Sequence, residues 1–279
     1  MKKLGALVGL SLAGLLVSCG GGATTDTNGN TGGGGGLSDC NQTGYDIYLG
    51  YYIEDGSTNP EDPTSGFLVA CMPSNDGIFK TQFLFSYYGC QGGIDYGTVN
   101  GNRTGNSVGG TWSGTVDSIN IGGDFNGSWD GVKFSGTWDN NSGKVHVQVG
   151  SCEYYVAPNG QWWLYSLNSD QGGLNISVSG SGPTISWNNS LSGVQGFFIS
   201  VYDKQCVYNR ISLADCTMWA LGCTNSVSSA TYGTVPSGCL ELSSDKALTT
   251  NTDYVVSIVA YGSSQSDVKA FATKVFTAP

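Results

Sequence analysis

Short apolar runs alternate with turn-forming residues through the N-terminal half of this chain. Four runs rich in aromatic and β-branched residues stand out: residues 78–85, 144–149, 154–156 and 162–165. Asn75-Asp76-Gly77 precedes the first run, residues 140–143 precede the second, and Pro158-Asn159-Gly160 separates the last two. Turn signals beside such runs are typical of β-hairpins. The pattern therefore predicts successive hairpins in an antiparallel meander.

A short tryptophan pattern recurs between these runs. It reads Gly110-Thr111-Trp112, Gly127-Ser128-Trp129 and Gly136-Thr137-Trp138, with steps of 17 and 9 residues. These steps suit one strand or one hairpin each, and not a solenoid of fixed period. Glycine inside a strand marks a bend or a close approach of backbone, which a barrel or a curled sandwich needs. We expect residues 39–165 to form a small antiparallel barrel or sandwich.

The C-terminal half carries a different alternation. Ile185-x-Trp187 is followed by apolar residues at 197, 199 and 201, and Leu248 precedes Tyr254 by six residues. This part, residues 170–279, resembles a fibronectin type III domain. The resemblance implies that these segments are strands B, C and F, with Trp187 in the core, Tyr254 as the tyrosine corner and residues 270–277 as the last strand. It also implies a spacer or contact module without catalysis.

One segment departs from that family. Residues 202–240 are much longer than the usual connection and carry four cysteines, so we expect a disulfide-bonded insertion. Met218-Trp219-Ala220-Leu221 in its middle is either a buried plug or an exposed contact.

Composition supports an all-β chain of two domains. Glycine contributes 44 of 279 residues, and charged residues make up 11%, less than half the usual share of about 25%. Helix-forming residues at helical spacing are not a feature of the chain. The formal net charge of -10 gives no attraction for a phosphate backbone, so we expect no nucleic acid partner.

The first residues predict export. Lys2 and Lys3 precede an apolar stretch, residues 4–17, which is typical of a secretory signal peptide and too short to span a bilayer. The stretch ends at Ser18-Cys19 and resembles the lipobox of bacterial lipoproteins. The resemblance implies a signal peptide at 1–18, an acylated Cys19 and an outer-membrane or surface location if the host has an outer membrane. Residues 20–38 are glycine-rich, as in a flexible linker. The alternative is an ordinary secretory signal with an incidental cysteine.

The remaining cysteines number four in each half. They are Cys40, Cys71, Cys90, Cys152, Cys206, Cys216, Cys223 and Cys239. An exported chain meets an oxidising compartment, so we expect four disulfides, with the pairing left open. A zinc site is the weaker alternative because no C-x-x-C pair is present and His146 is the only histidine.

Tryptophans are the candidate binding residues. They are Trp112, Trp129, Trp138, Trp162, Trp163 and Trp219. Amphipathic rings of this kind either form a stacking platform for sugar rings or supply the core. The acidic residues Glu54, Asp55, Glu61 and Asp62 are consistent with a calcium site or with a solvated loop; no metal and no cofactor is expected.

No catalytic constellation is recognisable. A G-x-S-x-G elbow is missing, and the four glutamates follow no motif. His146 as a general base is a minor alternative. The sequence predicts a lipid-anchored envelope protein with a non-catalytic binding or structural role, whose partner is an unknown envelope protein or a glycan. The alternatives are a carbohydrate-binding, less readily carbohydrate-cleaving, lipoprotein and a surface assembly component.

Overall fold

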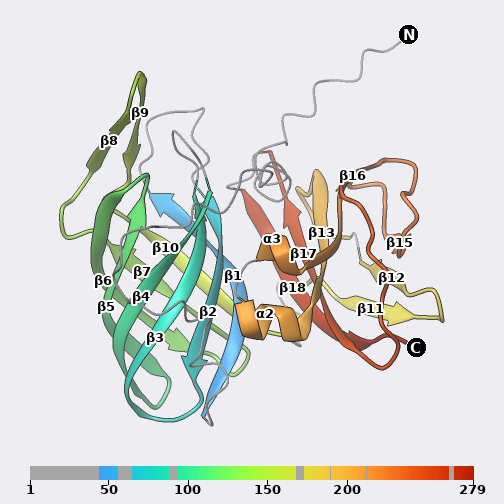
Figure 1. The fold of residues 1–279 in the computed structure, drawn as a ribbon, viewed down its shortest axis with the longest axis horizontal. Coiled ribbons are helices and arrows are strands. Elements are labelled where there is room, and N and C mark those ends of the chain that lie inside the picture. The colour runs from blue at the N-terminus through green and yellow to red at the C-terminus, as the bar shows by residue number, and fades with distance from the viewer. Residues whose placement is uncertain are drawn as a thin grey trace, which may run out of the picture.

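The computed structural model describes residues 44–55, 65–87, 93–167, 173–188, 190–210, 213–263 and 267–279. The first half is a closed barrel of eight antiparallel strands (Figure 1). In chain order these are β1 (Tyr45–Asp55), β2 (Ser65–Pro73), β3 (Gly77–Tyr87), β4 (Gly93–Thr104), β5 (Ser107–Val116), β6 (Ile119–Trp129), β7 (Lys133–Asp139) and β10 (Asn159–Ser166). Each pairs with the next, and β10 closes the barrel on β1. The all-β fold is confirmed, and a barrel is present where the sequence left a sandwich open.

One predicted hairpin is wrong. β9 (Cys152–Val156) pairs with β8 (Val145–Val149), and this two-stranded hairpin projects from the barrel (Figure 1). β10 pairs instead with β1 and β7, and it includes Asn159 and Gly160. Gly160 is therefore a strand residue: a Cβ there would lie 2.7 Å from the Trp138 ring. The glycine serves the approach of that ring and not a turn between β9 and β10.

Glycines and aromatic rings interleave on the inner wall of the barrel. A Cβ at Gly66 would lie 2.4 Å from the ring of Tyr52, and one at Gly97 would lie 2.2 Å from the ring of Phe83. In the recurring Gly-x-Trp pattern the middle residues, Thr111, Ser128 and Thr137, are exposed on the outside. Because side chains alternate across a strand, the glycine and the tryptophan of each copy face inward together. These barrel glycines therefore make room for aromatic rings on the inner wall.

The second half is a sandwich of two sheets. One sheet contains β11 (Ile176–Ser179), β12 (Thr184–Trp187) and β15 (Ser229–Thr231). The other has the order β16 (Cys239–Ser243), β14 (Thr217–Thr224), β13 (Gly196–Asp203), β17 (Asp253–Tyr261), β18 (Val268–Thr277). One apolar cluster contains residues of both sheets. The strands predicted around Ile185, Phe197, Tyr254 and residues 270–277 are all present.

Two local features of the sandwich agree with the expectations for this half. The backbone N–H of Thr249 donates a hydrogen bond of 2.8 Å to the Tyr254 hydroxyl, while the Tyr254 ring is buried. Trp187 is buried edge-on against Phe197, with ring centroids 5.7 Å apart. These are the contacts of a tyrosine corner and a core tryptophan. Membership of the fibronectin type III family stays a prediction.

The cysteine-bearing insertion packs into the fold. It forms the short helices α2 (Lys204–Arg210) and α3 (Leu213–Cys216), followed by β14. Disulfides join Cys206 to Cys216 and Cys223 to Cys239. The interpretation of Trp219 as an exposed contact is wrong, because its side chain is 0% exposed within the sandwich core and its Nε1 donates to Glu241.

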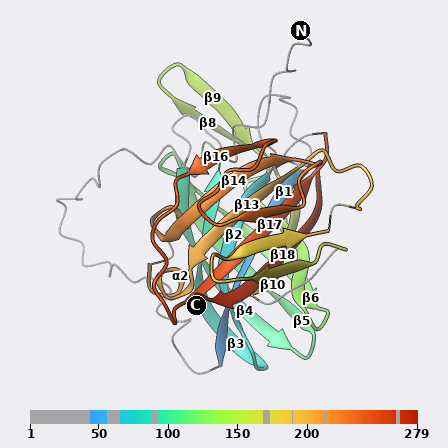
Figure 2. The ribbon, with the colours of Figure 1, turned by 90° about the vertical axis from the view of Figure 1, so that its right-hand side faces the viewer.

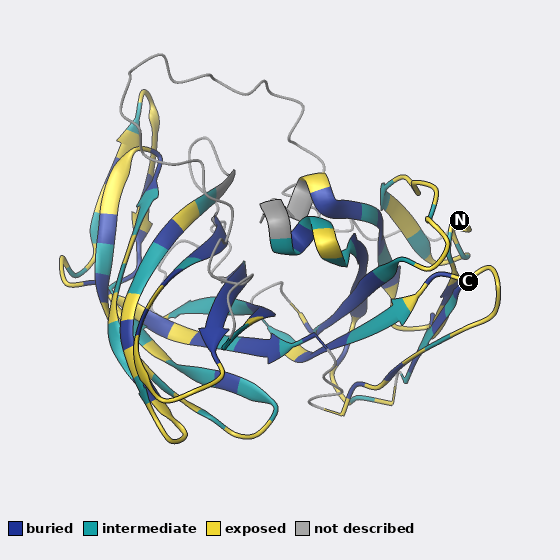
Figure 3. Cartoon of the chain, turned by 60° about the horizontal axis from the view of Figure 1, so that its bottom comes forward, coloured by how far each residue is buried: buried dark blue, intermediate teal, exposed yellow. Residues whose placement is uncertain are grey.

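The barrel and the sandwich share a third apolar layer. The outer face of the five-stranded sheet lies against the wall formed by β1, β2 and β10 (Figures 2 and 3). Phe271 contacts Tyr165 at 4.9 Å and Tyr51 at 6.0 Å between ring centroids, and the Thr273 hydroxyl donates to the Ser166 carbonyl oxygen at 2.6 Å. Burial raises the pKa of Tyr51 and of Tyr165. The two halves are therefore joined through a buried, largely apolar interface.

Several sequence predictions fall outside the described residues. These concern the signal peptide, Cys19, the linker, Cys40 and Cys90. Cys71 and Cys152 are also disulfide-bonded. The disulfides indicate an oxidising, extracytoplasmic environment. No helix within the described ranges is long and apolar enough to cross a membrane.

Candidate binding site inside the barrel

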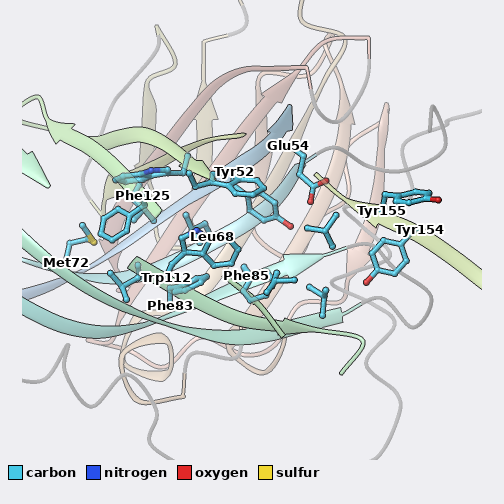
Figure 4. A pocket seen from close by; sticks show the side chains of 18 residues that line it. Tyr52, Glu54, Leu68, Met72, Phe83, Phe85, Trp112, Phe125, Tyr154 and Tyr155 are labelled. Atoms are coloured by element: carbon cyan, nitrogen blue, oxygen red, sulfur yellow. The ribbon is translucent and has the colours of Figure 1, made fainter. Parts of the chain in front are cut away.

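The barrel encloses a largely apolar cavity of about 130 Å³ (Figure 4). Its wall includes side chains from each of the eight barrel strands; Leu68, Met72, Phe83, Phe85, Phe125 and Leu164 are among them. All six are buried. A cavity needs roughly 10–15 Å³ of volume to hold one water molecule, so this cavity has room for on the order of ten ligand atoms.

Three of the predicted tryptophans line this cavity. Trp112 meets Trp138 edge to face at 5.7 Å between ring centroids, and Trp162 lies further along the wall beside Phe125 at 6.1 Å. The Nε1 of Trp112 donates to the Asp139 carbonyl oxygen at 2.9 Å, and that of Trp162 donates to the Thr137 carbonyl oxygen at 3.1 Å. The backbone thus fixes two rings with their apolar surfaces toward the cavity.

The two ends of the cavity differ. At one end Tyr48, Trp129 and Phe134 pack together with ring centroids 4.7 to 5.8 Å apart. At the other end lie Glu54, Tyr154 and Tyr155 (Figure 4). Tyr155 is 48% exposed, so the cavity reaches the surface beside the β8–β9 hairpin.

Polar groups gather toward the open end. The Tyr52 hydroxyl donates to the Ser86 carbonyl oxygen at 2.8 Å, and Glu54 accepts a hydrogen bond from the backbone N–H of Ala157 at 3.3 Å. Glu54 is the only charged side chain among those that line the cavity in the described part of the chain. The site can therefore hold an apolar body with a small polar end.

The other three predicted tryptophans lie elsewhere. Trp129 helps to fill the opposite end, and Trp163 stacks on Tyr51 at 4.8 Å on the outer wall. Trp219 belongs to the sandwich core. The six residues therefore do not form one platform. The three on the inner wall share a cavity, and the three others are packing residues.

Sequence reasoning missed most of the apolar wall. Phe83, Phe85 and Phe125 line the cavity, but the sequence pattern does not single them out as binding residues. A signal was available in residues 78–85, where Phe79, Phe83 and Phe85 share one face of a strand. Their inward position could have been inferred, whereas the cavity depends on barrel closure.

The alternative chemical sites are only partly placed by the structure. Glu61 and Asp62 of the acidic segment lie outside the described residues, so this site cannot be built. Across the described ranges, no group of three or more His, Cys, Asp or Glu could hold a metal.

His146 lies on the projecting hairpin. It is exposed on β8, where it contacts Glu153 at 3.2 Å and stacks on Tyr155 at 4.8 Å between ring centroids. It does not line the cavity. The geometry gives this histidine no enclosed reaction site.

The comparisons with known proteins do not identify a family for this chain. Comparison of the chain with protein-family models and with curated proteins finds no match.

Proposed function

We propose that this protein binds a small, mostly apolar molecule inside its barrel and acts outside the cytoplasm as a non-catalytic binding protein. The cavity carries this proposal. An eight-stranded barrel is just wide enough either to be filled by its side chains or to hold one small ligand. Here the inward glycines Gly97 and Gly114 let the rings of Phe83 and Phe85 lie close against the barrel wall.

The chemistry of the wall supports an apolar ligand. Transfer of apolar surface from water into such a site is favourable by about 25 cal/mol per Å². A sugar, by contrast, brings several hydroxyl groups that each need a partner once buried. Few polar side chains line the cavity, so carbohydrate binding is the weaker alternative.

The wall also favours binding over hydrolysis. Glycoside hydrolysis uses two carboxyl groups that flank one bond. Glu54 is the one carboxylate among the described side chains of the cavity wall. This observation favours binding over glycoside hydrolysis at this cavity.

A lipid at Cys19 would complete this role, since the linker of residues 20–38 would then tether the barrel near a membrane, where apolar molecules gather. Two or more acyl chains are needed for stable anchoring. Metabolic labelling with an alkyne fatty acid tests this part of the proposal. We expect label on the full chain and none on the Cys19→Ser variant; label on both would contradict it.

The binding proposal is tested with a small neutral fluorescent probe, 1-aminonaphthalene, whose size matches the cavity. We expect saturable fluorescence enhancement with the full chain. Val99→Trp places an indole in the cavity wall and should abolish the enhancement. Val235→Trp adds the same group to an exposed site and is the matched control. Both variants should keep their β-sheet circular dichroism. Equal enhancement by both folded variants, or none by the wild type, would contradict the proposal.

A further inference from the structure

The indole N–H of Trp138, a buried donor in the cavity wall, has no partner in the described part of the chain. The Nε1 of Trp138 is inaccessible to solvent, and no acceptor within the described residues meets it. The indoles of Trp112 and Trp162, in the same wall, both donate to backbone carbonyl oxygens. Among the three tryptophans that line the cavity, Trp138 is thus the one whose indole N–H has no acceptor in the described part of the chain.

Buried polar groups are normally paired, and an unpaired one requires a specific explanation. The Trp138 ring packs over Gly160 and beside Tyr52, at 6.3 Å between ring centroids. The Nε1 edge of the ring lies against Gly160, where a Cβ would be 2.7 Å from Nε1. A ligand's acceptor therefore reaches the N–H only when the ring tilts away from this glycine, and the hydrogen bond offsets the cost of that movement.

The polar groups stand in one row of the barrel. Gly160 pairs with Glu54 on one side and with Trp138 on the other. A donor and a carboxylate therefore flank the same glycine, near the open end of the cavity. A carbonyl oxygen can accept from the donor, and a hydroxyl group can also donate to the carboxylate.

The single charge of the wall selects against anions. A carboxylate head group placed in this row would lie close to Glu54, and like charges repel strongly where water is scarce. Lys144 lies 4.4 Å from the centre of the Tyr155 ring but does not line the cavity. The row therefore suits an uncharged head group.

We propose that the ligand is an uncharged amphiphile whose carbonyl or hydroxyl oxygen accepts the Trp138 hydrogen bond, with its apolar body directed toward Met72. This inference rests on the proposed function, because it specifies what the cavity binds. It excludes fatty acid anions as ligands of comparable affinity.

Displacement of 1-aminonaphthalene from the full chain tests the inference. We compare octan-2-one with 2-methyl-1-octene, in which a CH₂ group replaces the oxygen, and with octanoate. Octan-2-one should bind about 3- to 10-fold more tightly than the hydrocarbon, the net value of one hydrogen bond. Octanoate should bind at least 10-fold more weakly than octan-2-one at pH 8.

Three variants separate the causes. Trp138→Phe should remove the preference for octan-2-one over the hydrocarbon. Trp187→Phe is the matched control: it removes another buried, unpaired indole N–H, from the sandwich core, and should leave the preference unchanged. Glu54→Gln should narrow the gap between octanoate and octan-2-one.

Each failure has a distinct meaning. If the probe binds and is displaced, but the preference is missing or survives in Trp138→Phe, the inference is wrong while the proposed function stands. Octanoate as tight as octan-2-one would also overturn it. If wild type binds neither probe nor any of the three compounds, the proposed function fails and the inference falls with it.

Discussion

The barrel interior and the sandwich core are built from the same kinds of residue, but the sandwich core is tightly packed whereas the barrel interior contains a cavity. In the sandwich, Phe197, Trp219 and Tyr254 are almost completely buried and interlock with aliphatic residues of two facing sheets. In the barrel, Trp112 and Trp138 are only half-buried and surround a cavity. The difference shows that aromatic content alone does not define a core. Two sheets can close on their side chains, whereas a closed barrel keeps a fixed radius.

The unpaired indoles of the two regions sharpen this contrast. Trp138 and Trp187 both bury an Nε1 without an acceptor in the described part of the chain. Trp187 lies in a packed core, where its N–H is a tolerated defect. Trp138 lies in a cavity wall, where a ligand can reach the side chain.

The largest effect is expected from truncation in the packed region. Trp219→Ala should lower the free energy of unfolding by about 3–5 kcal/mol, because the surrounding sheets cannot collapse on the space. Trp112→Ala, on the cavity wall, should cost clearly less. Urea unfolding of both variants measures the difference. Equal losses would mean that the barrel interior is as tightly packed as the sandwich.

The disulfides of the sandwich insertion come next. Loss of Cys223–Cys239, which closes a 16-residue separation, should destabilise the fold by roughly 3 kcal/mol in the Cys223→Ser/Cys239→Ser variant. The shorter Cys206–Cys216 link, with a separation of 10, should matter a few tenths of a kcal/mol less. If each double variant loses less than about 1 kcal/mol of unfolding free energy relative to wild type, this expected stabilisation is contradicted.

Addition of a methyl group at Gly97 tests whether the inner wall is tightly packed at the edge of the cavity. Gly97→Ala would place a Cβ 2.2 Å from the Phe83 ring and 2.6 Å from the Ser113 carbonyl oxygen. We expect a loss of about 1–3 kcal/mol and weaker probe binding, because Phe83 must move into the cavity. Gly182→Ala, with nothing within 4 Å, is the control. Unchanged probe binding in Gly97→Ala would show that this glycine does not shape the site.

A single hydrogen bond in the sandwich should give a smaller effect. Tyr254→Phe removes the acceptor of the Thr249 N–H and should cost about 1 kcal/mol. Tyr96→Phe, at an exposed ring, should be neutral. Chemical denaturation resolves the two. A neutral Tyr254→Phe would mean that the corner contact does not stabilise this sandwich.

The smallest effect is expected at the surface. Hydrogen bonds from Thr277 and Lys204 hold the pKa of Asp253 below its usual value. A lowered folded-state pKa contributes stability above the unfolded pKa of about 3.9, and this contribution is lost as the pH falls through the folded pKa. Asp253→Asn should therefore cost less than 1 kcal/mol at pH 7, and this cost should shrink as the pH is lowered from 7 to 2. A constant loss across that range would contradict an electrostatic origin.

The sequence predicted strands more reliably than their partners. The runs around Phe83, Phe197 and Tyr254 all form strands, because alternation and turn residues are local signals. The predicted hairpin across Pro158 is wrong because Gly160 lies within strand β10 and not in a turn. Its role, the approach of the Trp138 ring from a neighbouring strand, depends on barrel closure.

The apolar layer between the two halves could have been predicted from two strands whose residues are apolar on both faces, and do not alternate between apolar and polar. Residues 197–202 and 254–260 are almost continuously apolar, and β13 and β17 are buried on both faces. Continuous runs of this kind indicate a sheet covered on both sides. The candidate site was half predicted: three tryptophans line the cavity, but the cavity requires the full ring of strands.

The location of a bound ligand tests the central claim most directly. Crystals of the protein soaked with 8-bromooctan-2-one should give an anomalous bromine peak inside the barrel, near Met72 and Phe125, with the carbonyl oxygen within hydrogen-bond distance of the Trp138 Nε1. A bromine peak confined to the outer surface, with the barrel interior free of the compound, would contradict the account.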